Sequence, residues 1–359
     1  MQRSPTQASG RAWGWLALLL DGSVTPWRES TATAEPRLPF FPAAQQLESL
    51  RRLNVAAATA GRRVSPELAR ALLLDGITDR NRGDLRLVGE DEWPFGPPAV
   101  QPSLLPARDL LPVVAGPLAR RLAALPERRP RRPLPLVRGV RLDGDPWAAA
   151  VAHLRQTARG RSRTGRRAVV LTDDFGTVAL RAWGHQAVSG GVLGPQDWLS
   201  NRIRPEGPPP ALRLAKQAQR VAAEVGVRRT LVVVGPLPVA GLPPTPPFDP
   251  VAVDLARWVG RPLGVLVSPE RRRHLLLESL VPQATRAAGP LTVPAPWHDL
   301  LTAYAERQRS LLRGAGYPVL GSLDGLLPAP VSATAFHRDD DVLDRALELL
   351  LDPQGGMDR

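Results

Sequence analysis

The sequence predicts an α/β protein with a doubly wound, mostly parallel sheet in its C-terminal half and a helical, proline-rich N-terminal region. After about residue 136, short runs that are apolar throughout alternate with helical segments. Such runs are typical of parallel strands that are buried on both faces. Before residue 125 the patterns are helical instead. With 43% hydrophobic and 23% charged residues, the 359-residue chain has enough apolar material to bury a core.

A proline- and arginine-rich stretch separates the two halves. Residues 126–135 hold four arginines among prolines, and proline interrupts both helices and central strands. A chain of this length also exceeds the usual size of a single core. We therefore predict a mainly helical region over residues 1–125, a linker over 126–135 and an α/β domain with a nucleotide-type fold over 136–359.

Three helices are predicted in the N-terminal region: residues 45–60, a helix that begins at Ser65, and residues 108–125. At the second of these, serine, proline and glutamate supply an N-cap, a first-turn proline and an acid that compensates the helix dipole. We expect Pro112 and Pro117 to interrupt the third helix.

In the C-terminal half, strands and helices are predicted to alternate. The predicted strands are residues 134–140, 168–172, 230–234 and 263–267. The predicted helices begin at Asp145, follow the second strand through Trp183, cover residues 211–225, and begin again at Asp249 and Ser268. Helical crossovers between parallel strands require this alternation.

Candidate site residues lie where the predicted strands end, because ligands of open α/β sheets bind at the carboxyl ends of strands, near a reversal of strand order. We predict Asp173 and His185 as catalytic candidates and Asp145, Asp174 and Arg181 as ligand-binding candidates. Two simpler interpretations stay open. Asp173 and Asp174 also suit the N-cap of the next helix, and a histidine without a partner is often only a packed side chain.

The residues that several chemistries need are missing from this chain. It has no cysteine, and its only lysine, Lys216, lies inside a predicted helix. Thiol chemistry, cysteine metal sites and P-loop binding are therefore excluded. No glycine-rich phosphate loop follows a strand, no metal spacing joins the five histidines, and no GxSxG elbow is present. We identify no cofactor and no metal site in the sequence.

The formal charge of +13 raises the question of nucleic acid as a partner. The densest basic segment, residues 155–167, mixes arginine with glycine, serine and threonine and holds no aromatic residue. A solvated loop fits this pattern better than a nucleic-acid module. Binding of phosphate or nucleic acid through arginine-rich segments remains an alternative, and the partners are unknown.

One apolar run bears on localisation. Residues 13–20 are too few to cross a bilayer. The spacer between this run and the small residues 32–34 is long and bulky for a signal peptide. We expect no membrane span and a cytoplasmic location.

The segment VVLTDDFGT, residues 169–177, resembles the DxDGT nucleophile motif of the haloacid dehalogenase-like phosphatases. In that family the first aspartate attacks phosphorus and the second transfers a proton, so the resemblance implies Asp173 as nucleophile. Phe175 stands where the second acid belongs, and Lys216 precedes the next strand instead of following it. The acid/base partner and the lysine of that family are thus missing.

A broader resemblance covers about half of the chain. The string LLRGAGYPVLGSLDGLLPAP, followed by FHRDDDVLDRALELLL, resembles the C-terminal end of sulfotransferase-like proteins of high-GC bacteria. The order of a strand, a helix with Trp183, the segment PQDWL, a helix and a strand is similar to that family's core. The resemblance implies a nucleotide-binding α/β fold and transfer of a sulfuryl group.

The chain departs from that family at the donor site. RLDGDPW, residues 141–147, stands where the family has its PxxxGT-type loop, and Thr172, Asp173 and Asp174 replace the arginine for the nucleotide's 3′-phosphate. Two acids there would repel a phosphate. We therefore expect a divergent, non-catalytic relative that serves as a binding or structural module. The alternative is an active group transferase whose crevice uses Asp145, Asp173, Arg181 and His185.

Overall fold

The chain forms two compact units. The computed structural model describes residues 7–35, 41–74, 85–88, 99–126, 140–148, 167–235, 248–286, 291, 293–329 and 336–352. Unit 1 comprises residues 1–125, 258–268 and 338–359, and unit 2 comprises residues 126–257 and 269–337. Nearly all of the predicted linker, and the basic segment up to residue 166, lie outside the described residues.

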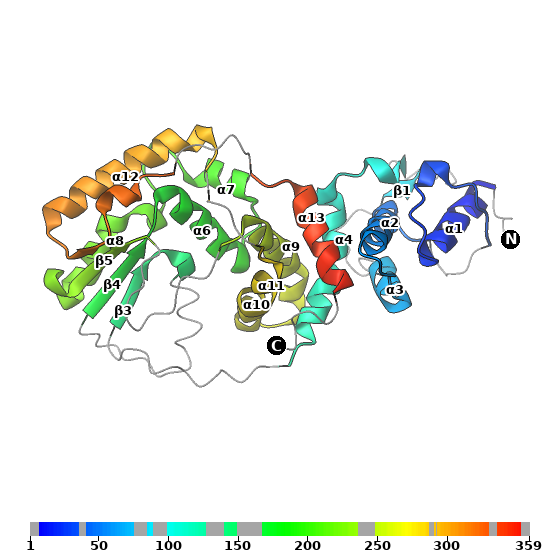
Figure 1. Cartoon of the computed structure of the whole chain (residues 1–359), viewed down its shortest axis with the longest axis horizontal. Coiled ribbons are helices and arrows are strands. Elements are labelled where there is room, and N and C mark those ends of the chain that lie inside the picture. The colour runs from blue at the N-terminus through cyan, green and yellow to red at the C-terminus, as the bar shows by residue number, and fades with distance from the viewer. Residues whose placement is uncertain are drawn as a thin grey trace. The chain divides into compact units, whose positions relative to one another are not determined.

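Unit 1 is built mainly of helices (Figure 1). Its elements are α1 (Gln7–Leu20), η1 (Trp27–Glu29), α2 (Ala44–Thr59), α3 (Pro66–Leu74), β1 (Arg86–Leu87), β2 (Ala99–Val100), η2 (Pro102–Leu104), α4 (Ala107–Ala123), the end of α9 (Pro250–Leu266), and α13 (Asp339–Leu351). The predicted helices at residue 45 and at Ser65 are confirmed, and the Ser65 hydroxyl accepts the N–H of Leu68. Helix α2 packs against α1, α3, α4 and α13, and α13 lies along α4.

Helix α4 runs without a break through Pro112 and Pro117, so the predicted interruption is wrong. A proline inside a helix costs about 3 kcal/mol. Leu110, Leu111 and Val114, however, are fully buried, and burial of each such side chain stabilises by about 1.5–3 kcal/mol. The packing of α4 against α2 and α13 therefore outweighs the free-energy cost of the two prolines.

Unit 2 contains a parallel sheet of four strands. They are β3 (Val140–Gly144), β4 (Arg167–Thr172), β5 (Thr230–Val234) and β6 (Val319–Leu320). The strands predicted at 168–172 and 230–234 are confirmed. Of the strand predicted at 134–140, only Val140 is among the described residues, and it begins β3. The mixed α/β prediction thus holds for this unit.

The order of these strands follows the chain, β3-β4-β5-β6. A doubly wound sheet reverses its order at one point. Within the described part of the chain no such reversal occurs, so the doubly wound arrangement is not confirmed. The carboxyl ends of neighbouring strands nevertheless lie side by side, because every pair is parallel.

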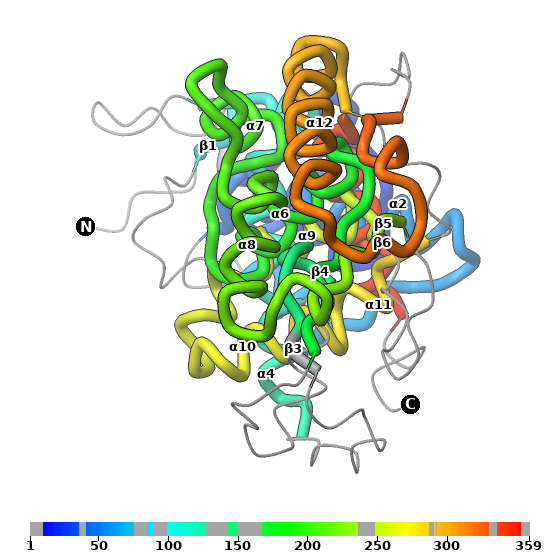
Figure 2. Tube along the Cα trace, turned by 90° about the vertical axis from the view of Figure 1, so that its left-hand side faces the viewer, coloured from blue at the N-terminus to red at the C-terminus, as the bar shows by residue number. Residues whose placement is uncertain are grey.

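Most of the rest of the described part of unit 2 is helical. The helices are α6 (Phe175–Val188), α7 (Pro195–Arg202), η3 (Pro210–Leu212), α8 (Leu214–Val225), η4 (Val227–Arg229), the start of α9, α10 (Pro269–Leu275), the π-helical turn η5 (Leu276–Leu280), α11 (Val281–Ala284), α12 (Ala295–Ala315) and η6 (Leu323–Leu326). Helix α8 packs on β3, β4 and β5, and α12 packs against both α6 and α8 (Figure 2). The helices predicted after Asp145, Asp249 and Ser268 are confirmed at these positions.

The strand predicted at residues 263–267 is wrong, because all but the last of these residues belong to α9. A strand buried on both faces needs consecutive apolar side chains to be covered. Leu263 is fully buried, whereas Val265 is 88% exposed. Val259 and Leu263, four positions apart, are both buried, which is the helical spacing.

Candidate functional site

Three of the five predicted site residues contact one another at the carboxyl ends of β3 and β4. Asp145 follows β3, Asp173 follows β4 and Arg181 lies on α6. Arg181 Nη1 donates to Asp145 Oδ2 at 2.9 Å and to Asp173 Oδ2 at 3.0 Å. We call these three residues the strand-end cluster. It joins the ends of two neighbouring strands through a single guanidinium group.

Asp145 is held in place by the turn that ends β3. Gly144 has a φ of +105°, and a Cβ there would overlap the carbonyl oxygen of Leu171 on β4. Only glycine fits both conditions without strain. The turn brings the N–H of Asp145 within 2.7 Å of the Leu171 carbonyl oxygen. The close approach of β3 to β4 therefore fixes the carboxylate that meets Arg181.

Asp145 is almost fully buried, with 2% of its surface exposed. Burial raises the pKa of its carboxyl group, and the nearby Arg181 opposes that rise. Its second oxygen, Oδ1, accepts the backbone N–H groups of Trp147 at 2.9 Å and Ala148 at 3.4 Å. Asp145 is thus also the cap of the short helical turn at residues 146–148, as predicted.

Asp173 and Asp174 have different roles. Asp173 pairs with Arg181 through one oxygen and accepts the N–H of Asp174 at 3.0 Å through the other. Asp174 is the N-cap of α6, where it accepts the N–H of Thr177 at 3.0 Å. Burial raises the pKa of the Asp174 carboxyl, and its hydrogen bonds with Thr177 oppose the rise. Asp174 therefore is a helix cap, whereas Asp173 belongs to the strand-end cluster.

His185 lies one turn beyond Arg181 on α6 and is partly buried. Burial and then the positive charge of Arg273 lower the pKa of its imidazole below the ordinary 6.5. Among the described residues, no hydrogen bond joins His185 to Asp173. A base that acts with the strand-end cluster needs a direct or water-bridged contact with one of its residues. His185 is therefore not assigned to the cluster, and the charged group that acts on it is Arg273.

The polar groups at these strand ends are largely occupied by the chain itself. Four backbone N–H groups donate to its own aspartates: Gly144 to Asp143 at 2.9 Å, Trp147 to Asp145 at 2.9 Å, Asp174 to Asp173 at 3.0 Å, and Thr177 to Asp174 at 3.0 Å. Asp143 also pairs with Arg220 at 2.6 Å. Arg181 Nε is buried and has no acceptor among the described residues. The carboxylates of Asp145 and Asp174 therefore occupy the N-terminal ends of helical turns, where an anionic ligand would otherwise bind.

Unit 2 contains a second buried polar group, which the sequence does not predict. His337 Nε2 lies 3.1 Å from Asp254 Oδ2, and Arg257 Nε donates to Asp254 Oδ1 at 2.5 Å. The three side chains are between 3% and 8% exposed. Burial alone would raise the pKa of Asp254. The hydrogen bond with His337 and the charge of Arg257 outweigh this effect, so that the pKa lies below its ordinary 3.8. The Asp254–Arg257 pair has helical i,i+3 spacing, but nothing local in the sequence points to His337.

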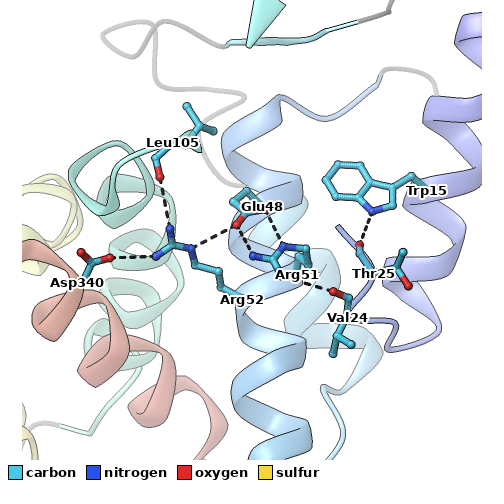
Figure 3. A network of polar contacts seen from close by, with 8 residues as sticks. All are labelled: Trp15, Val24, Thr25, Glu48, Arg51, Arg52, Leu105 and Asp340. Carbon is cyan, nitrogen blue, oxygen red and sulfur yellow. Dashed lines mark hydrogen bonds and ion pairs between the residues drawn. The ribbon is translucent and has the colours of Figure 1, made fainter. Parts of the chain in front are cut away.

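Unit 1 has its own buried polar network, centred on Glu48 (Figure 3). This carboxylate is 1% exposed and accepts two hydrogen bonds from Arg51, at 2.7 and 2.8 Å, and one from Arg52 at 3.3 Å. The bond to Glu48 raises the pKa of Arg51. Arg52 also reaches Asp340 on α13 and the carbonyl oxygen of Leu105, each within 3.4 Å. The network connects α2 to α13 and to the end of η2, just before α4.

Comparison with known proteins gives no relative for this chain. Protein-family models, curated proteins and solved structures were each searched without a match. None of the described helices is long and apolar enough to span a membrane. In the described part of the chain, no group of three or more histidine or acidic side chains is arranged to hold a metal ion.

Proposed function

We propose that this chain is a non-catalytic binding or structural module with an α/β second unit, divergent from the sulfotransferase-like proteins that its C-terminal half resembles. One observation carries the proposal. At the ends of β3 and β4, the chain's own aspartates accept the backbone N–H groups and the guanidinium that an anionic donor group would need.

Charge supports the same conclusion. The strand-end cluster holds two carboxylates and one guanidinium, and a further carboxylate, Asp174, caps the adjacent helix. A phosphoryl or sulfuryl donor at this edge would meet excess negative charge in a poorly hydrated setting, where charges interact strongly. The alternative of an active group transferase requires Arg181 to leave both aspartates.

Ligand-dependent thermal stability tests this proposal. A nucleotide at 100 times its dissociation constant stabilises a protein by about 2.7 kcal/mol. We expect no change in Tm with adenine nucleotides or with a 3′-phosphoadenosine sulfuryl donor, and no transfer of the sulfuryl group to a phenol. A donor-dependent rise in Tm together with transfer of the sulfuryl group, both abolished by Arg181→Met and both kept by the matched control Arg202→Met on α7, would instead establish the transferase.

A further inference from the structure

A second group of polar side chains lies where α6 ends, and the strand-end cluster does not use it. It consists of His185 and Ser189 from α6 and its C-cap, and Arg272 and Arg273 from α10. We call these four residues the α6–α10 basic site. His185 and Ser189 are four positions apart and so lie on one face of the helix.

Arg272 joins α10 to the end of α6. Its Nη2 donates to the carbonyl oxygen of Ser189 at 3.0 Å. The next residue, Gly190, has a φ of +108°, and a Cβ there would come within 2.8 Å of the same nitrogen. The guanidinium of Arg272 therefore rests directly over the backbone of this turn, and glycine makes the room for it.

The site holds polar atoms that the protein does not satisfy. Arg272 Nε, Arg273 Nε and Ser189 Oγ are each inaccessible to solvent and have no hydrogen-bond partner among the described residues. A buried donor without an acceptor costs about 1–3 kcal/mol. Native proteins pair nearly all such groups with protein, water or ligand. Because Arg272 contacts the backbone of Ser189, unpaired donors from α6 and from α10 both occur where the two helices meet, and they point to a bound acceptor.

The charge at this site is also uncompensated. The acids next to it in sequence, Glu270 and Glu278, form no ion pair with Arg272 or Arg273 in the described structure. The carboxyl end of α6 supplies roughly half a negative charge, against two full positive charges. Burial is the main cause of the lowered pKa of the His185 imidazole, and the positive charge of Arg273 is the second cause. A net positive charge therefore remains.

We propose that the α6–α10 basic site binds a tetrahedral oxyanion, the phosphate or sulfate group of a small molecule, between Arg272, Arg273, Ser189 and His185. Guanidinium groups match the oxygens of such an anion with paired, charge-assisted hydrogen bonds. The serine hydroxyl and a neutral imidazole supply further donors. This inference does not rest on the proposed function, because the strand-end cluster takes no part in it.

Histidine NMR on the full-length chain tests the site with inorganic phosphate and inorganic sulfate as probes. His185→Gln identifies the His185 signal. We expect either anion, at constant ionic strength set with chloride, to raise the pKa of His185, because a bound anion stabilises the imidazolium. Tighter binding of one anion identifies the group that the natural ligand carries.

Two variants make the test specific. Arg273→Gln, which removes no hydrogen bond between described residues, should weaken binding about tenfold or more, since a charge-assisted bond contributes about 1.5–3 kcal/mol. Ser189→Ala provides a second, smaller reduction. Arg202→Gln, an exposed arginine on α7, is the matched control and should bind as the wild type does. An unchanged pKa of His185 with both anions, or equal binding by Arg273→Gln, would overturn the proposal.

Discussion

Arg181 Nη1 lies 2.9 Å from Asp145 Oδ2, so a residue on α6 is tied to the residue that follows β3. The pair is separated by 36 positions in the chain. Because the same nitrogen also reaches Asp173 at 3.0 Å, the guanidinium holds two strand ends together. Through this guanidinium, the predicted site residues Asp145 and Asp173 both contribute to the structure of unit 2.

Arg181→Met should therefore destabilise the protein strongly. The substitution leaves Asp145, which is 2% exposed, without its counter-charge. Removal of one partner from a buried ion pair costs about 3 kcal/mol or more. Urea denaturation of the wild type and the variant measures this loss directly.

A double variant separates the charge from the packing. In Asp145→Asn/Arg181→Met no unpaired charge is buried, and asparagine can still cap the turn at residues 146–148. We expect its free energy of unfolding to lie closer to that of the wild type than that of Arg181→Met alone. A double variant as unstable as the sum of the two single variants would contradict the pairing of these residues.

The interaction of Asp254 with His337 and Arg257 predicts a loss of stability in acid. The folded pKa of Asp254 lies below its ordinary 3.8, so the unfolded chain takes up the proton first as the pH falls. The contribution is complete above the unfolded pKa and is lost as the pH drops below it towards the folded pKa. Free energies of unfolding at pH 6 and pH 3 should show a difference between wild type and Asp254→Asn that shrinks in acid.

Comparison with a variant is needed because other acids act in the opposite direction. The pKa values of Asp145 and Asp174 are raised in the folded protein, so each of these groups adds stability as the pH falls through its folded pKa. The total pH profile mixes both signs. If the difference between wild type and Asp254→Asn were the same at both pH values, the lowered pKa of Asp254 would be refuted.

The parts of the strand-end cluster that the sequence predicts are those with local signals. Asp145 and Asp174 precede helices and act as caps within three residues, and the apolar runs before them mark the strands. Arg181 is also among the predicted ligand-binding residues. The ion pairs of Arg181 depend on the parallel register of β3 and β4, which the sequence pattern does not predict.

Contacts between distant segments could not be predicted. His337 lies 83 positions from Asp254, and Ser189 lies 83 positions from Arg272. The wrong strand at 263–267 has a different cause. A short apolar run fits a strand and a helix equally well, and only the exposure of Val265 distinguishes them.

Glu48→Gln should destabilise unit 1 by about 2–3 kcal/mol. The carboxylate is 1% exposed and accepts hydrogen bonds from both Arg51 and Arg52. A neutral amide has one acceptor oxygen, whereas these donors now contact two carboxylate oxygens. Partly buried guanidinium groups left unpaired carry a desolvation cost. Thermal unfolding followed by circular dichroism measures the change, with the exposed Glu35→Gln as control. A loss no larger than that of the control would mean that Glu48 does not organise the network.

Gly144→Ala should destabilise unit 2 by at least about 2 kcal/mol, because it combines a strained backbone with overlap of the β4 carbonyl. The positive φ of +105° disfavours any side chain, and the carbonyl oxygen of Leu171 cannot move without breaking the pairing of β3 with β4. Gly194→Ala is the matched control, since its φ is −64° and a Cβ there meets no atom within 4 Å. Chemical denaturation should show a shift of the midpoint for Gly144→Ala and almost none for Gly194→Ala. Equal stability of the two variants would mean that this turn does not position Asp145 against Arg181.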